Sequence, residues 1–355
     1  MVLILLLPLL VYIPGLTGFF YPVGSIYSDL VISHFPNSSY VLQSLIQFKQ
    51  IPLWSSTIMS GYPFFADPLS GLWYPPAWVA LLFPLPLGIN LIVLLHIFWG
   101  GIGLTLFLRH EGLKPAAALM GGLLFELFPK ITAHFAAGHI TLIYAVFWSP
   151  WLLWSLRKQT DRPRFGINNF LPGVILGIIF LADPRWVVYA SILWAGYNLV
   201  LVLRNMRYSR YEKEERRTDT FKRWGMSIGI QPLIAVGIAA PLLLPLNQFT
   251  SLSTRIVMTA ADRMVFSMPP ARLLGIIFPN PTEYVEWVIY PGLFVVGALV
   301  MSAVSPGVRK KCWGWLLLIL GSLVFALGAE IPGMNAILNL PGLNLLRVPP
   351  RILFL

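Results

Sequence analysis

The sequence predicts an all-α, polytopic membrane protein with about nine to ten transmembrane helices. Of its 355 residues, 57% are hydrophobic and only 11% are charged, and the mean hydropathy is +0.74. These values lie outside the range of ordinary soluble domains. Apolar stretches of about 20 residues, the length that crosses a bilayer, recur along the whole chain. The alternating pattern of a membrane β-barrel is absent, and helices satisfy their own backbone groups in lipid.

The predicted spans form a single transmembrane domain, residues 1–355. They lie near residues 1–20, 87–108, 115–129, 140–156, 166–182, 186–204, 225–249, 286–304 and 312–328, with a tenth beginning at Ile352. The first stretch lacks a basic segment and a small-residue cleavage site, so we expect an uncleaved helix rather than a signal peptide. The glycine-rich "WGGIGLTLF" predicts close helix packing. Because the sequence stops at "RVPPRILFL", entering an apolar run, we expect a truncated C-terminus.

Lysine and arginine residues predict the orientation of these spans. With a cytoplasmic N-terminus, 17 of the 25 basic residues fall in four inner loops: "RHEGLK", "RKQTDRPR", "RNMRYSRYEKEERRTDTFKRW" and "VRKK". We expect the basic cytoplasmic loop at 204–224 to contact anionic lipid headgroups. The net charge of +11 therefore reflects topology, and no nucleic-acid partner is predicted. The single Cys312 excludes an internal disulfide.

The first extracytoplasmic loop, residues 21–86, is predicted to be ordered. After Pro36, which suits a first helical turn, apolar side chains share one side of an interfacial helix: Val41, Leu42, Leu45 and Ile46. Asn37, Ser44 and Gln47 share another side. The segment "IPLWSSTIMSGYPFFADPLSGLWYPPAW" is rich in Pro, Gly, Trp and Tyr, which indicates an ordered loop at headgroup depth. Such a loop can cover a cavity.

Asp29 lies about one turn beyond the first apolar stretch, in "YPVGSIYSDLVISHF". A carboxylate held against a membrane surface is partly desolvated, which raises its pKa and makes it a usable base. Alternatively, Asp29 caps the interfacial helix or simply meets water. His34 and Asp67, in the same loop, are candidate substrate-binding residues.

The second outer loop, "PKITAHFAAGHI", contains Lys130, His134 and His139. Lysine and histidine can bind a phosphate or stabilise a phosphate leaving group by their charge. The histidines could equally be interfacial residues bonded to the backbone, and a zinc site would need a third ligand. Glu126, one turn before Lys130, could form a structural pair with it.

Two outer segments carry arginine. Arg347 and Arg351, in "LLRVPPRILF", flank two prolines and could bind an anionic headgroup bidentately. The alternative is simple snorkelling to the interface. In "ADPRW", Asp183 and Arg185 are expected to form a local ion pair at a turn between helices.

Taken in order, these outer-loop motifs resemble those of the YfhO-like bacterial membrane proteins, within the GT-C class of polyprenyl-phosphate-dependent glycosyltransferases. The resemblance rests on "SD" after the first helix, "W…SGYPFFADP…YPP", "GH" leading into "FWSPW", and "RVPPR". It covers essentially the whole chain.

The resemblance implies a GT-C-like fold and an inverting sugar transfer on the non-cytoplasmic side. The donor would be a polyprenyl-phosphate sugar, and the acceptor a hydroxyl of a cell-envelope glycan, lipid or protein. Asp29 matches the position of the general base, and Lys130, His139, Arg347 and Arg351 are the candidates for the donor phosphate. His134 joins His34 and Asp67 as a candidate substrate contact. "KITAHFAAGH" lacks the metal-binding acid of many GT-C members, so we favour a reaction without metal over a divalent ion held by Asp29 and a histidine.

Two other functions remain open. A multi-pass transporter or lipid flippase would need ionisable residues within its spans and broken helices, for which Pro241 and Pro245 are the best indication. A non-catalytic scaffold of a cell-envelope complex would tolerate Asp29→Asn. Polar residues concentrate at one membrane face, which favours the enzyme.

Overall fold

The structure is a computed structural model that describes residues 2–15, 28–58, 60–160, 165–208, 214–253, 258–280, 284–340 and 342–355. The chain is 77% helical, and the described residues form no strand. The only extended pairing among them is one isolated antiparallel bridge between Ser55 and Tyr62. The all-α prediction is confirmed.

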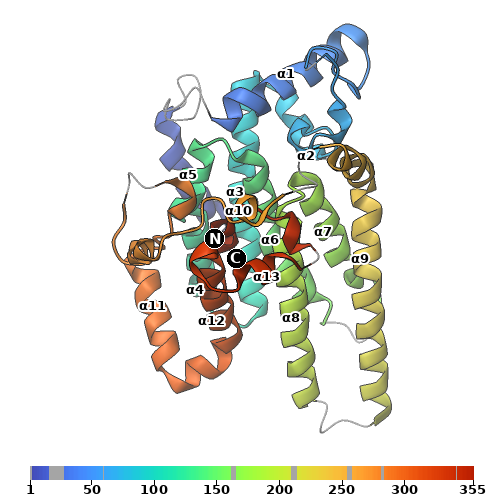
Figure 1. Cartoon of the computed structure of the whole chain (residues 1–355). Coiled ribbons are helices and arrows are strands. Elements are labelled where there is room, and N and C mark those ends of the chain that lie inside the picture. The colour runs from blue at the N-terminus through green and yellow to red at the C-terminus, as the bar shows by residue number, and fades with distance from the viewer. Residues whose placement is uncertain are drawn as a thin grey trace. The chain divides into compact units, whose positions relative to one another are not determined.

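The helices from α3 to α6 follow one another with short connections, whereas long segments separate α1 from α2 and α10 from α11 (Figure 1). Their bounds are α1 Phe35–Gln43, α2 Pro75–Val79, α3 Leu85–His110, α4 Pro115–Glu126, α5 Pro129–Ala136, α6 Ile140–Lys158, α7 Leu171–Ala182, α8 Trp186–Tyr208, α9 Glu214–Ser251, α10 Ala260–Arg263, α11 Leu293–Val304, α12 Pro306–Ala326 and α13 Met334–Leu338. The 3₁₀ segment η1, Val2–Gly15, precedes them, and π-helical turns at Leu30–His34 and Ser44–Phe48 flank α1.

Several of these helices could cross a membrane. Among the described residues, four segments are long and apolar enough: Leu85–His110, Pro115–Ala136, Trp186–Arg204 and Trp224–Ser251. Helices α11 and α12 give a fifth if they count as one span, although they meet at a bend of 113°. Predicted spans near 140–156 and 166–182 correspond to α6 and to the shorter apolar helix Ile167–Ala182.

Three predicted boundaries differ from the structure. The apolar helix expected from residue 286 begins at Leu293, after Pro291 and Gly292. The basic "VRKK" expected as a loop belongs to α12, because Pro306 suits the first helical position. The basic loop 204–224 is also largely helical, since α8 runs to Tyr208 and α9 starts at Glu214; residues 209–213 lie outside the described residues.

The chain divides into two compact units, which are described separately. Unit 1 contains residues 1–126 and 135–253, and unit 2 contains residues 127–134 and 254–355. In unit 2, α12 packs against the 3₁₀ segment Pro349–Phe354, and α11 and α12 form a bent pair.

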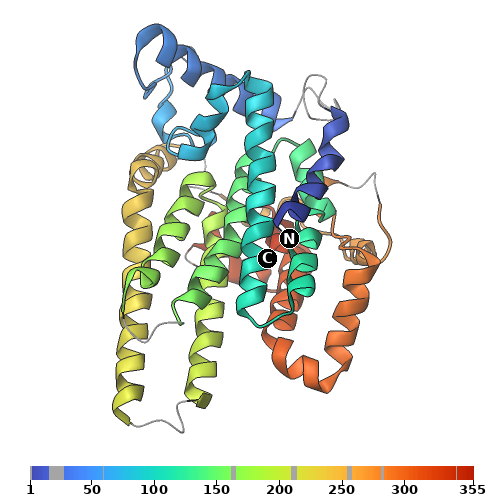
Figure 2. The same ribbon diagram turned by 180° about the vertical axis from the view of Figure 1, so that it is seen from behind.

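Unit 1 is built around α3, which packs against α4 and α6 (Figures 1 and 2). Glycines of "WGGIGLTLF" make this contact close. A Cβ on Gly100 would lie 2.1 Å from the ring of Phe147, and one on Gly103 would lie 2.7 Å from the indole nitrogen of Trp151. The predicted role of this motif in helix packing is confirmed.

Three of the predicted inner segments meet at Glu111, just beyond α3. Its carboxylate accepts hydrogen bonds from Tyr197 and Arg204 and pairs with Arg157 at 3.2 Å. The ends of α3, α6 and α8 therefore lie together, which is consistent with their predicted placement on one side of a membrane.

At the opposite end of these helices lies the first loop, whose α1 crosses the helix ends (Figure 1). Val41, Phe64 and Leu72 form its small core, packed with Trp73 and Trp78. The polar atoms of its large side chains bond to loop carbonyls: Tyr40 to Trp54, Trp73 to Phe65, and Trp78 to Leu72. The prediction of an ordered loop with a helix after Pro36 is confirmed. Asn37 and Ser44, expected on the polar side, are buried instead, and Asn37 donates to the Leu69 carbonyl.

Gly100→Ala tests the α3–α6 contact. The added methyl would press into Phe147, and overpacking of this kind costs about 1–3 kcal/mol. We expect a lower thermal unfolding midpoint in detergent. Gly196→Ala in α8 is the matched control, because nothing lies within 4 Å of its Cβ position; it should be neutral or slightly stabilising. Equal midpoints for the two variants would contradict the close packing.

Candidate functional site

Asp29 stands at the start of the first-loop helix without capping it. Its carboxylate makes no cap hydrogen bond. Ser28 caps instead, with its carbonyl accepting from Val31 and Ile32 and its hydroxyl lying 3.4 Å from the Val31 nitrogen. The alternative that Asp29 serves as a helix cap is therefore wrong.

The carboxylate faces His139, at the start of α6. The distance from Asp29 Oδ2 to His139 Nε2 is 3.6 Å, and the Asp29 side chain is 51% exposed. The Asp29 backbone N–H donates to the Ala137 carbonyl at 3.1 Å. Gly138 permits this approach: its φ is +82°, and a Cβ there would lie 2.3 Å from the Leu30 nitrogen. The "AAGH" motif thus positions both the acid and the histidine.

His34 lies buried one turn along the same helix. Burial lowers the pKa of its imidazole from 6.5 to about 4, and the neighbouring charges of Arg185 and His139 act in the same direction, whereas Asp29 and a backbone hydrogen bond with Leu69 oppose it. Asp29, His34, His139 and Arg185 are thus electrostatically coupled in unit 1.

Asp183 and Arg185 form the ion pair that the sequence predicts. Asp183 is buried; its Oδ1 accepts from the Arg185 backbone N–H and Nε, each at 2.9 Å. Its Oδ2 accepts from Arg185 Nη2 at 2.5 Å and from the Thr141 hydroxyl at 3.2 Å. Both oxygens of Asp183 accept hydrogen bonds, and those from Arg185 hold its guanidinium in place. The Arg185 side chain is nevertheless 40% exposed.

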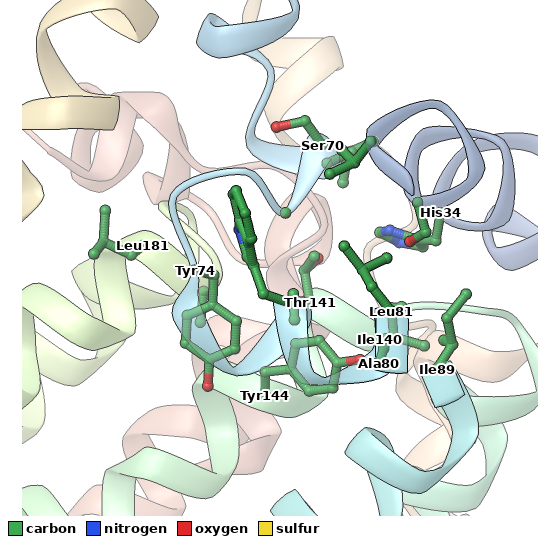
Figure 3. Close-up of a pocket in the computed structure, with 17 residues that line it drawn as sticks. His34, Ser70, Tyr74, Ala80, Leu81, Ile89, Ile140, Thr141, Tyr144 and Leu181 are labelled. Atoms are coloured by element: carbon green, nitrogen blue, oxygen red, sulfur yellow. The ribbon is translucent and has the colours of Figure 1, made fainter. Parts of the chain in front are cut away.

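A small cavity of about 40 Å³ lies beneath the first loop, lined by His34, Ser70, Tyr74, Thr141 and Tyr144 among others. Figure 3 shows the Tyr74 and Tyr144 rings together, with the His34 imidazole across from them. A space of this size holds a few water molecules, whereas pockets for organic ligands are several hundred Å³. Asp29 is not among its lining residues.

A buried polar network ties the loop to the helices below. Tyr74 donates to His96 Nε2 at 2.5 Å, because His96 Nδ1 lies 2.7 Å from the Ile92 carbonyl and donates there. Trp148 donates to the Tyr74 oxygen at 2.8 Å. Burial raises the pKa of Tyr74 far above its ordinary value, so the hydroxyl keeps its proton for this bond.

Three other predicted site residues gather around Glu286 in unit 2. Lys130 is fully buried and donates to the Glu286 carbonyl at 2.6 Å. Arg351 donates from Nε and Nη2 to Glu286 Oε1, and His134 Nε2 lies 3.5 Å from Oε2. Phe354 covers Lys130 and His134. Lys130 belongs to unit 2 and Glu126 to unit 1, so the expected pair between them stays a prediction.

The remaining two predicted residues serve local structure. Arg347 is exposed and donates from Nε to the Asp262 carbonyl at 3.2 Å. It does not take part in the hydrogen bonds that Lys130 and Arg351 make to Glu286. Asp67 accepts from the Leu69 N–H at 2.8 Å and so caps a 3₁₀ turn.

Sequence reasoning missed two residues. Glu286, in "YVEWVIY", was absorbed into a predicted span, although an acid among aromatic residues near a span is itself a signal. The sequence predicts only a structural ion pair for Arg185, yet the charge of Arg185 also contributes to the low pKa of His34. The position of Arg185 in an outer turn, directly after an apolar helix, is the sequence signal that could have indicated a role beyond the ion pair.

Asp29 and His139 could share a divalent ion, since a carboxylate oxygen and an imidazole nitrogen are both metal ligands. Two protein ligands are one fewer than catalytic zinc sites use.

Compared with known proteins, the chain matches no protein-family model, no curated protein and no solved structure.

The low pKa of His34 predicts a pH-dependent stability. The folded protein keeps this imidazole neutral down to about pH 4, while the unfolded chain takes up the proton near pH 6.5. The free energy of unfolding should therefore fall as the pH drops from about 6.5 to about 4, by at most about 3 kcal/mol from this group. Thermal midpoints at pH 7.5 and 5 should differ less in His34→Gln than in the wild type. An unchanged difference would contradict a buried neutral imidazole.

Proposed function

We propose that the chain is a membrane glycosyltransferase of the GT-C type. It would move a sugar from a polyprenyl-phosphate donor to a hydroxyl of a cell-envelope glycan, lipid or protein. The reaction would take place on the extracytoplasmic face of the cell membrane, in a fold of nine to ten spans. Several helices that could span a membrane, and a first loop packed over their ends, are consistent with this proposal.

The observation that carries the proposal is the pairing of Asp29 with His139 at 3.6 Å, on an exposed side of unit 1. Attack by a hydroxyl on an anomeric carbon requires a carboxylate within hydrogen-bond reach of the hydroxyl proton. Asp29 is half exposed and makes no cap bond, so its oxygens can accept that proton. His139 would orient the carboxylate. The sugar would bind at the exposed side of Asp29, since the cavity beneath the loop is too small for it.

The leaving phosphate needs a cation beside it. Arg185 is the cation coupled to this group in unit 1, and Asp183 holds its guanidinium in place. We therefore add Arg185 to the proposed phosphate-binding residues. Lys130, Arg347 and Arg351 remain proposals for the same role, as do His34, Asp67 and His134 for substrate binding. Their hydrogen bonds to Glu286 and Asp262 mean that Lys130, Arg351 and Arg347 would have to exchange partners to bind phosphate.

A second function, a multi-pass transporter or lipid flippase, is favoured by two observations. Glu126 is a fully buried carboxyl in the candidate span Pro115–Ala136, as transport would require. Helix α9 also contains Pro232, Pro241 and Pro245. A transporter would show substrate movement in proteoliposomes without any sugar transfer.

Asp29→Asn tests the enzyme directly. Amide substitution removes the proton acceptor, and loss of a general base typically costs about 10²–10⁴-fold in rate. We expect a loss of that size in transfer of radiolabelled hexose from polyprenyl-phosphate hexose in reconstituted membranes.

Glu330→Gln, an exposed acid of unit 2, is the matched control and should retain full activity. His139→Gln should give an intermediate loss, because it removes the positioning group but leaves the base. Equal transfer by Asp29→Asn and the wild type would remove Asp29 as the base.

A further inference from the structure

Glu126 is an acid that the proposed reaction does not use. It is the last residue of α4 and lies near the middle of the 22-residue candidate span Pro115–Ala136. Its side chain is completely buried, and neither Oε1 nor Oε2 has a hydrogen-bond partner among the described residues. A carboxyl in this position needs a physical explanation.

The carboxyl is pressed into the contact between α4 and α3. A Cβ on Gly101 of α3 would lie 1.6 Å from Glu126 Oε1, so a larger residue at position 101 would force the Glu126 side chain to move. One turn earlier in α4, a Cβ on Gly122 would lie 2.3 Å from the Thr105 hydroxyl and 3.2 Å from Leu5. The Thr105 hydroxyl is also buried without a hydrogen-bond partner among the described residues. The α3–α4 contact is therefore tightly packed around this carboxyl.

No hydrogen bond joins Glu126 to a cation among the described residues of unit 1. Three titratable side chains of α3 bond elsewhere: His96 to Tyr74, Arg109 to the Leu113 carbonyl and His110 to the Leu106 carbonyl. The η1 segment, which also packs on α4, has no charged residue. Lys130, the nearest cation in sequence, donates to the Glu286 carbonyl.

Two physical effects disfavour a negative charge at this position. Burying an ionised carboxylate without hydrogen bonds costs far more than burying the neutral acid. The C-terminal end of a helix also carries the negative pole of the helix dipole, and Glu126 ends α4. Both effects favour the protonated, neutral form of the Glu126 carboxyl.

We propose that Glu126 is a proton-binding site within the α3–α4 contact of the membrane domain. The carboxyl holds one proton there, and the proton leaves only to water that enters between the two helices. This site is independent of the sugar-transfer chemistry at Asp29.

A protonated carboxyl in apolar surroundings has a distinctive reaction with dicyclohexylcarbodiimide. The acid proton moves to one carbodiimide nitrogen, and the carboxylate oxygen bonds to the central carbon. The acyl group then migrates to a nitrogen and gives a stable N-acylurea, with no other reactant. Ionised carboxylates do not take the first step, and water-soluble carbodiimides do not reach a site closed from water.

The experiment treats the full chain in membranes with dicyclohexylcarbodiimide and maps the adduct by peptide mass spectrometry. We expect labelling of Glu126 at pH 8 to be at least half that at pH 6. An ordinary exposed carboxyl should lose about 100-fold over the same interval, because its protonated fraction falls tenfold per pH unit. Glu126→Gln should remove the adduct, and Asp29, half exposed, is the internal reference for the water-soluble reagent.

Three results would overturn the proposal: no adduct at Glu126, a 100-fold fall in its labelling between pH 6 and pH 8, or equal labelling by the water-soluble reagent. Protection of Glu126 by sodium chloride, but not by choline chloride, would also overturn it, because the occupant would then be a metal ion. Since the adduct is mapped in the wild type, the outcome does not depend on whether Glu126→Gln folds.

Discussion

The candidate site depends on one backbone contact, the hydrogen bond from the Asp29 N–H to the Ala137 carbonyl. Gly138 makes it possible, because a side chain at its position would collide with the Leu30 nitrogen. The contact joins the first-loop helix to the turn before α6 and so brings a carboxylate and an imidazole from distant parts of the sequence within 3.6 Å. Ser28 supplies the helix cap, so the Asp29 carboxylate is not used to cap the helix.

The same end of unit 1 is stiffened by buried polar groups that are fully satisfied. Asp183 accepts bonds from Arg185 and Thr141, and Tyr74 bonds both His96 and Trp148. In a low-dielectric interior such bonds are strong, and breaking one leaves a costly unpaired group. The loop above the helices therefore has few alternatives to its observed position, and that rigidity is what a site for chemistry requires.

Much of this could be predicted from local pattern. The helical class, the ordered aromatic loop, the helix after Pro36, the close packing at "WGGIGLTLF" and the Asp183–Arg185 pair all follow from hydropathy, spacing or turn chemistry. Local pattern does not predict the grouping of Lys130, His134 and Arg351 around Glu286. These residues lie up to 221 positions apart in the sequence, and the hydropathy pattern places Glu286 inside a predicted span. Long-range pairing of buried charges leaves no periodic signal in a single sequence. The start of α11 at Leu293 differs from the prediction because apolar residues precede it in the sequence, whereas the start of α12 at Pro306 differs because the first turns of that helix carry the basic residues of "VRKK", which predict a loop.

Burial distinguishes the acids of this chain by role. Asp183 and Glu286 are buried and each is bonded by an arginine, so their charges are compensated within the structure. Glu126 is buried without a hydrogen-bond partner among the described residues, which favours its neutral form. Asp29 alone among these four combines exposure to a possible substrate with a histidine neighbour and freedom from a structural bond at its carboxylate. A general base has to be charged before the reaction and able to accept a proton during it. Of these four acids, Asp29 is the one whose exposed carboxylate a substrate hydroxyl could reach, and for this reason we propose it as the base.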